Sequence, residues 1–413
     1  MFSRLYRKWM FAWETALTTR DTNRIVRPLE WGFDWLPPVA TPVGRDLDNM
    51  IALNREIVAD SDSFFSYATP SDFRLESRPP QLFPTNVRPE TLAKDAELKQ
   101  QAESGTLKPA EFLRFTSPVR TPHPENDQVN ARWFPASPAQ QQKFRRLGKP
   151  PQALIVMPQW NADGLSHNAL CEIFNRFGIS CLRLSKPYHD IRRPAEIERS
   201  DYACSSNVGR TISSCRQAVA DIRSCIDWLE TQGYRQFGVM GTSLGSCYGF
   251  IAAAHDPRLE GCAFNHASTW FGDVVWTGQS TRHIRAAFEQ AGLTQSDVRG
   301  IFEAISPMAY MEQFATTSRQ SLVIHATYDL TFIEEFSLDV LRNFNRLNVD
   351  YVSRVLPCGH YTSGETPYKY MVAWHLGKFI HDAFKRLSQR SLEVNSSLAS
   401  NVRANPDSPA TTN

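Results

Sequence analysis

The sequence lacks both a long apolar run and a strong excess of charge of either sign. No stretch of its 413 residues approaches the roughly 18 consecutive apolar residues of a membrane-spanning helix. Forty-five lysines and arginines are balanced by 43 aspartates and glutamates, which gives a net charge of +2. Because a dedicated nucleic-acid binder concentrates positive charge, we expect no nucleic-acid partner. Apolar residues make up 42% of the chain, which is typical of a globular protein.

Cysteine is missing before Cys171, and no two of the eight cysteines form a C-x-x-C pair. This pattern fits neither a disulfide framework nor a zinc ribbon, so we expect reduced thiols. The N-terminal segment also lacks the uninterrupted apolar core and the small-residue cleavage site of a secretory signal. We therefore expect a cytoplasmic location.

Motifs for cofactors are missing as well. The chain has no G-x-G-x-x-G motif, no Walker-type G-K-[ST] motif and no H-E-x-x-H motif. His167, His189 and His266 do not have the close spacing of metal ligands. We therefore expect neither a metal ion nor any other cofactor.

Composition divides the chain into three regions. Residues 1–110 are rich in aromatics and arginine and form a predicted helical or irregular extension. Residues 111–386 alternate between strand and helix patterns and form the main predicted domain. Residues 387–413 carry almost no apolar content towards their end, which predicts a disordered tail.

The main domain contains short apolar runs separated by amphipathic helical patterns. The predicted strands are residues 112–117, 128–134, 153–157, 179–184, 237–240, 259–264, 322–326 and 349–355. Strands that alternate with helices favour right-handed crossovers and a parallel sheet with both faces covered. We predict an α/β fold with a mostly parallel eight-stranded sheet and helices on both faces.

One pattern carries chemistry at the end of the strand at 237–240. Gly241-Thr-Ser243-Leu-Gly245 is a G-x-S-x-G motif between a strand and a helix, the setting of a nucleophile elbow. The two glycines allow the backbone to approach itself closely at a sharp turn. Ser243 is the candidate nucleophile, although the five-residue pattern also occurs by chance.

A serine nucleophile needs a base and an acid that orients the base. Asp329 follows the strand at 322–326, and His360 follows the strand at 349–355. Both lie at the carboxyl ends of strands, where ligand sites of open α/β sheets are found. His375 and His381 also follow Asp329, but they lie in the predicted last helix, where packing or solvent exposure is the ordinary role. We predict Asp329 as the acid and His360 as the base.

These residues resemble those of the α/β-hydrolase superfamily over residues 112–386. The resemblance rests on the Ser243 motif, on Asp329 after its strand and on the Gly359-His360 pair. A narrower resemblance, to the branch called α/β-hydrolase domain-containing protein 18, rests on residues 186–194 and 228–234. That branch has Pro-Tyr-Tyr where this chain has Pro187-Tyr188-His189.

The resemblance implies an oxyanion hole built from two backbone N–H groups. The first belongs to Leu244, directly after the nucleophile. The second belongs to the loop after the strand at 153–157, where the superfamily often has His-Gly and this chain has Pro158-Gln159. Proline has no N–H, so we expect Trp160 first and Gln159 second as the donor.

Two further sets of residues are candidates for substrate binding. Arg192 and Arg193 follow a strand and are suited to a carboxylate or phosphate, although such a pair is more often a solvated turn. Trp270 and Trp276 lie in an insertion at 265–321, which we predict to be a helical cap lining the acyl or alcohol pocket. The alternative for these aromatics is ordinary core packing.

The segment from Phe2 to Leu17 is predicted as an amphipathic helix with aromatics on one face and basic residues on the other. It is expected to dock on the chain's own domain, with peripheral membrane contact as the alternative.

The expected activity is that of a serine hydrolase that cleaves a small-molecule carboxylic ester or thioester through an acyl-enzyme. Acyl transfer to an alcohol, peptide hydrolysis and a non-catalytic binding role are the alternatives. The sequence contains no signal for an oligomeric state.

Overall fold

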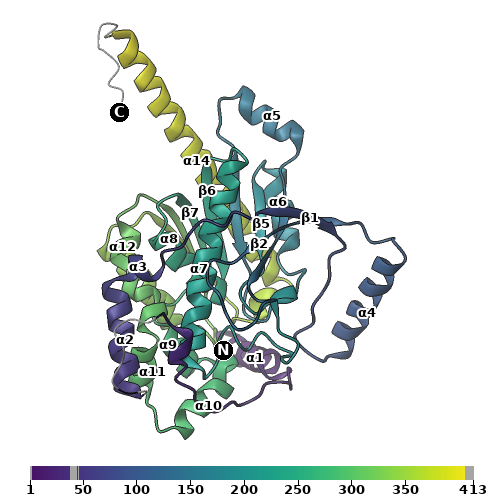
Figure 1. Ribbon diagram of the computed structural model, residues 1–413, viewed down its shortest axis with the longest axis vertical. Coiled ribbons are helices and arrows are strands. Elements are labelled where there is room, and N and C mark those ends of the chain that lie inside the picture. The colour runs from purple at the N-terminus through teal and green to yellow at the C-terminus, as the bar shows by residue number, and fades with distance from the viewer. Residues whose placement is uncertain (1, 38–43, 45, 405–413) are drawn as a thin grey trace.

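The computed structural model describes residues 2–37, 44 and 46–404, and its centre is a nine-stranded sheet (Figure 1). The strand order is β1-β2-β3-β5-β4-β6-β7-β8-β9. The first three pairings, from β1 to β5, are antiparallel, and every pairing from β5 to β9 is parallel. The strands are β1 (Arg74–Arg78), β2 (Ala110–Thr116), β3 (Gln128–Phe134), β4 (Gln152–Met157), β5 (Ser180–Leu184), β6 (Gln236–Thr242), β7 (Leu259–Asn265), β8 (Gln320–Ala326) and β9 (Tyr351–Leu356).

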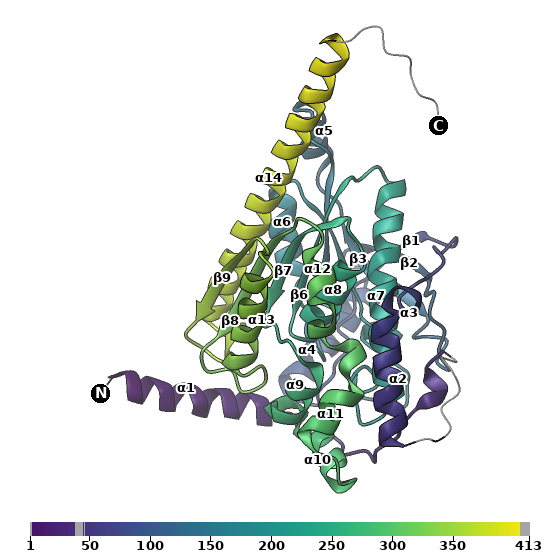
Figure 2. The same ribbon diagram turned by 90° about the vertical axis from the view of Figure 1, so that its left-hand side faces the viewer.

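Helices cover both faces of this sheet, as Figure 2 shows. α7, α8 and α13 contribute to the hydrophobic cluster on one face, and α1, α6 and α14 contribute to the cluster on the other. The central strands β4, β5 and β8 are buried at every position because both of their faces are covered. The helices named so far are α1 (Phe2–Thr19), α6 (Asn168–Arg176), α7 (Val208–Thr231), α8 (Leu244–Ala254), α13 (Glu334–Arg346) and α14 (Tyr368–Ala404).

The predicted α/β architecture is confirmed, but the sheet has nine strands where the sequence predicts eight. The additional strand is β1, which pairs with β2 at the edge of the sheet. Its sequence, Arg-Leu-Glu-Ser-Arg, has one apolar residue and is mostly exposed. Backbone hydrogen bonds to β2 hold this strand in place, and it has no apolar face. Its sequence therefore lacks the alternation of apolar and polar residues from which a strand is predicted. Through β1, the N-terminal region becomes part of the sheet.

The segment between β7 and β8 is helical, in line with the predicted insertion. It contains α9 (Phe271–Thr277), α10 (Arg282–Gln290), α11 (Gln295–Ile301) and α12 (Met311–Ala315). α9 packs on α11, and Gly272 lies so close to the Val298 carbonyl that a Cβ would clash there. α11 also packs on α2 (Leu47–Ala59) of the N-terminal region. The remaining α-helices of the described residues are α3 (Ser61–Phe64), α4 (Pro89–Glu103) and α5 (Pro138–Arg146).

Helix α1 docks on the body of the protein, as the sequence predicts, but Glu14, which the helical pattern places on the polar face, is buried, and Trp9, from the aromatic face, is half exposed. Met10, Glu14 and Leu17 are buried against the domain. Leu5 and Trp9 remain about half exposed on the other side of the helix. Membrane contact through the exposed side chains of Leu5 and Trp9 therefore stays a prediction. No helix in the described ranges combines the length and the apolar character needed to cross a bilayer.

The predicted tail differs from the structure. α14 does not end near residue 386 but continues to Ala404, and residues 405–413 lie outside the described part of the chain. The physical reason is that neither glycine nor proline interrupts the chain between Gly377 and Pro406. A low apolar content limits packing, but it does not by itself end a helix.

Candidate active site

The turn at Ser243 is sharp and places a residue with a side chain in the left-handed region of backbone space. Ser243 joins β6 to α8 with a φ of +56°, a strained region for a residue with a side chain. A Cβ on Gly241 would collide with the Gly245 backbone, and a Cβ on Gly245 would collide with the carbonyl of Met157. The two glycines of the motif are therefore required by the close approach of the turn to itself and to the loop after β4.

The structure brings the three predicted residues together. His360 Nε2 lies 3.0 Å from Ser243 Oγ, and His360 Nδ1 lies 2.9 Å from Asp329 Oδ2. The other oxygen of Asp329, Oδ1, accepts the backbone N–H groups of Thr331 and Phe332, both at 2.7 Å. An acid oriented in this way can hold the Nδ1–H tautomer of the imidazole, which leaves Nε2 free to accept the serine proton.

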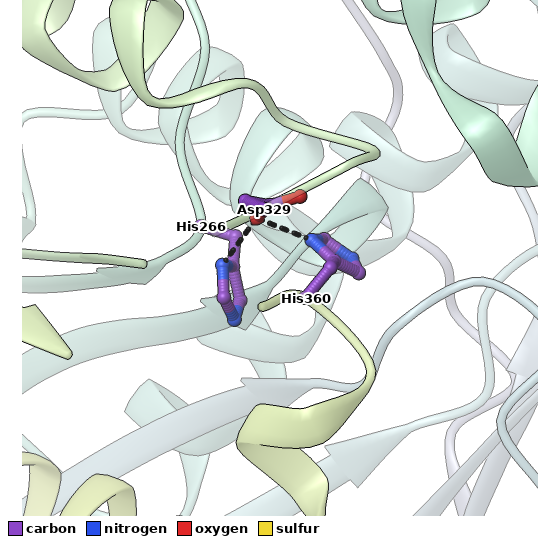
Figure 3. Close-up of side chains that lie close together, drawn as sticks. All are labelled: His266, Asp329 and His360. Carbon is purple, nitrogen blue, oxygen red and sulfur yellow. Dashed lines mark hydrogen bonds and ion pairs between the residues drawn. The ribbon is translucent and has the colours of Figure 1, made fainter. Parts of the chain in front are cut away.

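A fourth residue, His266, joins this group from the end of β7 (Figure 3). Its Nδ1 lies 2.9 Å from the same Asp329 Oδ2, and its Nε2 lies 3.0 Å from Ser363 Oγ. The ring centroids of His266 and His360 lie 4.3 Å apart. The sequence argument considered His266 only as a metal ligand. Its position directly after β7, at the same sheet edge as Ser243, was the signal that could have identified it.

The charges of this cluster depend on one another. Burial alone would raise the pKa of Asp329, but the adjacent His360 and His266 hold it below its usual value. Burial lowers the pKa of His360. Asp329 and Glu14 raise this pKa, and the net effect is a raised pKa. The pKa of His266 is lowered by burial and by His360. The arrangement thus favours an ionised Asp329, a neutral His266 and a basic His360.

Donor atoms of His266, Asp329 and His360 lie within 4.8 Å of one another, which is close enough to surround a metal ion. The same atoms, however, form the chain of contacts that ends at Ser243. A cation bound there would occupy the oxygen that orients His360. A second such group, His123, Glu125 and Glu196, is more exposed.

The loop after β4 lies beside the start of α8, where the resemblance implies an oxyanion hole. The backbone N–H groups of Leu244, Gln159 and Trp160 donate to no acceptor within the part of the chain that the structure describes. The side chains of Leu244 and Trp160 line the cavity next to Ser243. No acceptor in the described residues therefore competes for these N–H groups, and their role as oxyanion donors stays a prediction, as does the choice between Trp160 and Gln159.

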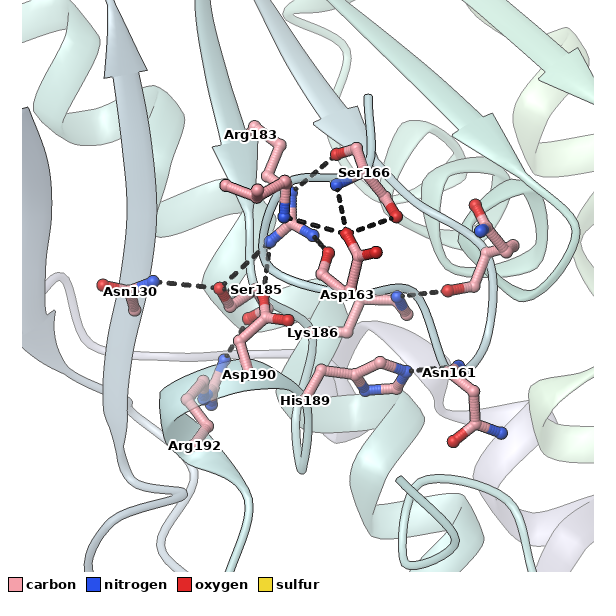
Figure 4. Close-up of polar contacts among 12 residues, drawn as sticks. Asn130, Asn161, Asp163, Ser166, Arg183, Ser185, Lys186, His189, Asp190 and Arg192 are labelled. Carbon is pink, nitrogen blue, oxygen red and sulfur yellow. Dashed lines mark hydrogen bonds and ion pairs between the residues drawn. The ribbon is translucent and has the colours of Figure 1, made fainter. Parts of the chain in front are cut away.

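Buried polar side chains form hydrogen bonds to this loop (Figure 4). Lys186 Nζ donates to the Gln159 carbonyl at 2.9 Å, and the Asn161 N–H donates to His189 Nε2 at 3.2 Å. Burial holds the pKa of His189 well below its usual value, so its Nε2 is available as an acceptor. Lys186, from the segment that carries the narrower resemblance, and His189, where the chain departs from that branch, therefore both hold the loop after β4 in place.

The two predicted substrate-binding arginines have structural roles instead. Arg192 is fully buried and pairs with Asp221 at 2.8 Å, and Arg193 donates to the Pro84 carbonyl at 2.7 Å. Neither lines the cavity beside Ser243. The prediction of a clamp was wrong because the sequence does not show that the loop folds inward onto α7, where Asp221 lies.

The two predicted tryptophans also lie outside the cavity lining. Arg299 covers the ring of Trp270 at 5.2 Å, and Arg285 covers the ring of Trp276 at 4.9 Å. The insertion does contribute to the cavity, through Ser268, Phe271, Val274, Val275, Ser280, Thr281 and Pro307. The rotation of α9 about its axis determines which of its aromatic residues face the serine, and the sequence pattern does not determine this rotation.

The cavity beside Ser243 is small and mostly apolar, with a volume of about 50 Å³. On the same measure, one water molecule needs about 10–15 Å³, so the space holds only a few non-hydrogen atoms. It is lined by Trp160, Cys204, Ser243, Leu244, Cys247, Ser268, Phe271, Val274, Val275, Ser280, Thr281, Pro307, Thr331 and Phe332.

Comparisons with known proteins agree with this architecture. Residues 168–271 match the family model described as alpha/beta hydrolase domain containing 18. The acylaminoacyl peptidase of Pyrococcus horikoshii superposes with a TM-score of 0.50 at 11% identity, over 68% of this chain and 46% of the peptidase. Acetyl xylan esterase 1 of Thermoanaerobacterium sp. superposes with a TM-score of 0.50 at 12% identity, over 83% of this chain and 95% of the esterase. The chain has the α/β-hydrolase fold.

A curated Escherichia coli protein, described as an uncharacterized 31.7 kDa protein in the traX-finO intergenic region, is 39% identical over 71 residues. The match covers 16% of this chain and 24% of that protein. The chain thus matches about a quarter of this relative and under half of the peptidase.

Proposed function

We propose that this chain is a serine hydrolase that cleaves a carboxylic ester or thioester with a short acyl group. The proposal is carried by one observation: an unbroken series of contacts from Asp329 through His360 to Ser243, which ends at an apolar cavity. A binding protein without catalytic activity has no need of an imidazole within 3.0 Å of a strained serine.

In the proposed reaction, Ser243 Oγ attacks the carbonyl carbon while His360 Nε2 takes the hydroxyl proton. Asp329 stabilises the resulting imidazolium. The carbonyl oxygen becomes an oxyanion, which accepts hydrogen bonds from the N–H groups of Leu244 and of Trp160 or Gln159. His360 then gives its proton to the leaving alcohol or thiol, and the C–O or C–S bond breaks.

Hydrolysis completes the cycle. A water molecule gives a proton to His360 and attacks the acyl-enzyme carbonyl, and the carboxylic acid leaves as Ser243 recovers its proton. The short acyl group follows from the cavity volume of about 50 Å³ and from its apolar lining of residues such as Phe271 and Val275.

The test is hydrolysis of p-nitrophenyl esters from acetate to octanoate. We expect the largest kcat/KM for acetate to butyrate and a steep fall towards octanoate. Ser243→Ala should lower kcat by about 10³-fold or more, because only the oxyanion hole and substrate binding remain. Equal activity of Ser243→Ala and the parental chain would contradict the proposal. Activity that rises with acyl length would contradict the short-acyl assignment alone.

A further inference from the structure

A buried carboxylate on the first helix lies against the loop that carries His360. Glu14 is fully buried on α1. Its Oε1 accepts the backbone N–H of Tyr361 at 2.8 Å, and its Oε2 accepts the backbone N–H of Thr362 at 2.9 Å. These two N–H groups belong to the residues directly after His360. The helix at the start of the chain thus reaches a loop that lies nearly 350 residues later.

Both oxygens of Glu14 act as acceptors, which is the arrangement that suits an ionised carboxylate. A protonated carboxyl group would present a hydroxyl to one of the two N–H groups, and two donors would then face each other. Burial raises the pKa of Glu14, the two backbone hydrogen bonds oppose that rise, and the net effect is a raised pKa. Such a buried carboxylate is rare in a protein interior unless it is well paired, which indicates a specific role for it.

The loop is also shaped to receive this side chain. A Cβ on Gly359 would collide with the Glu14 side chain, so glycine before His360 leaves room for this carboxylate. Two side chains from the same N-terminal region hold the loop on either side of Glu14. Tyr6 donates its hydroxyl to the Pro357 carbonyl, and Arg24 donates to the Tyr361 hydroxyl at 3.3 Å.

We propose that Glu14 is a positioning residue for His360: it fixes the loop that carries the base, and its negative charge stabilises the imidazolium formed when Ser243 is deprotonated. This inference rests on the proposed role of His360 as the base. The other titratable or charged groups around Glu14 and His360 are Tyr6, Arg24, His266, Asp329, Cys358 and Tyr361. Among these groups, Asp329 is the charge that acts with Glu14 on His360.

The test is Glu14→Gln, with Glu365→Gln as the matched control in the same loop region. Glutamine keeps the shape and one acceptor, but it loses the charge and presents an NH2 group to one backbone N–H. We expect kcat to fall about 10- to 100-fold with little change in KM, since a displacement of about 1 Å can cost 100-fold in rate. Glu14 does not line the cavity, so binding should be preserved.

The pH profile separates this role from simple structural support. Removing a negative charge beside the imidazolium disfavours the protonated base, so the acidic limb of kcat/KM should move to lower pH in Glu14→Gln. Glu365→Gln should leave both the rate and the limb unchanged. A parental rate in Glu14→Gln, or a reduced rate with an unmoved limb, would overturn the proposal.

A second variant covers the case in which Glu14→Gln fails to fold. Glu14→Asp keeps the charge but withdraws the carboxylate by one methylene, so kcat should fall while the acidic limb stays near its parental position. A parental kcat in Glu14→Asp would overturn the positioning role. Failure of the Glu14 proposal is distinguishable from failure of the proposed function, because in the second case Ser243→Ala would itself retain the parental activity.

Discussion

Replacing Asp329 by asparagine probes the proton arrangement of the site. Asparagine keeps the shape of aspartate but exchanges one carboxylate oxygen for an NH2 group. Oδ1 of Asp329 accepts two backbone N–H groups, from Thr331 and Phe332, so an NH2 group in that position would face two donors. The amide oxygen therefore takes the place of Oδ1, and the NH2 group takes the place of Oδ2, beside the Nδ1 atoms of His266 and His360.

This orientation reverses the tautomer of the base. Facing an NH2 donor, His360 Nδ1 has to act as an acceptor, so the ring proton moves to Nε2. Nε2 then points its N–H at Ser243 Oγ, 3.0 Å away, and has no lone pair to receive the serine proton. The negative charge that stabilises the imidazolium is lost as well. We expect kcat to fall on the order of 10⁴-fold, equivalent to about 5 kcal/mol of barrier.

The assay is kcat/KM for p-nitrophenyl acetate, with thermal unfolding to verify that the variant is folded. Asp350→Asn is the matched control, because Asp350 precedes β9 at the opposite end of the sheet, where it accepts a hydrogen bond from Gln320. The control should keep nearly all of the activity. A folded Asp329→Asn variant within tenfold of the parental rate would refute the assignment of Asp329 as the orienting acid.

The remaining predictions concern the base, the pocket and the turn. Because the pKa of His360 is raised, kcat/KM should rise with pH through a midpoint above about 6.5 and then stay flat. His375→Ala should show the same profile. A midpoint well below about 6.5 would contradict this prediction. Val274→Ala enlarges the cavity and should raise the ratio of kcat/KM for the hexanoate ester to kcat/KM for the acetate ester up to roughly tenfold. An unchanged ratio would mean that the acyl chain binds elsewhere. Gly241→Ala should destabilise the protein by about 1–3 kcal/mol in chemical unfolding and lower activity; unchanged stability would mean that the turn is not closely packed.

The features that could be predicted from the sequence are those that a pattern of residue types within one segment indicates. β4 and β8 are buried on both faces and carry continuous apolar runs, so their positions follow from the pattern. Ser243, Asp329 and His360 each follow a predicted strand. Since the carboxyl ends of parallel strands meet at one edge of a sheet, their proximity could be predicted without coordinates.

The features that could not be predicted depend on contacts between distant segments. Glu14 is one polar residue on an amphipathic helix, and nothing near it in the chain reveals that it meets the loop after His360. Arg192 has the same appearance as a surface arginine until Asp221 is found beside it in the interior. His266 joins Asp329 only because β7 and β8 are neighbours in the sheet. In each case, tertiary packing assigns a role that residue type leaves open.

The central claim is that Ser243 is a nucleophile activated by His360. Labelling with a fluorophosphonate probe, followed by mass spectrometry of the digested protein, tests it directly. The account predicts one covalent adduct, on the peptide that contains Ser243, with labelling abolished in Ser243→Ala and strongly slowed in His360→Ala. A folded parental protein that forms no adduct, or labelling that persists in Ser243→Ala, would contradict it.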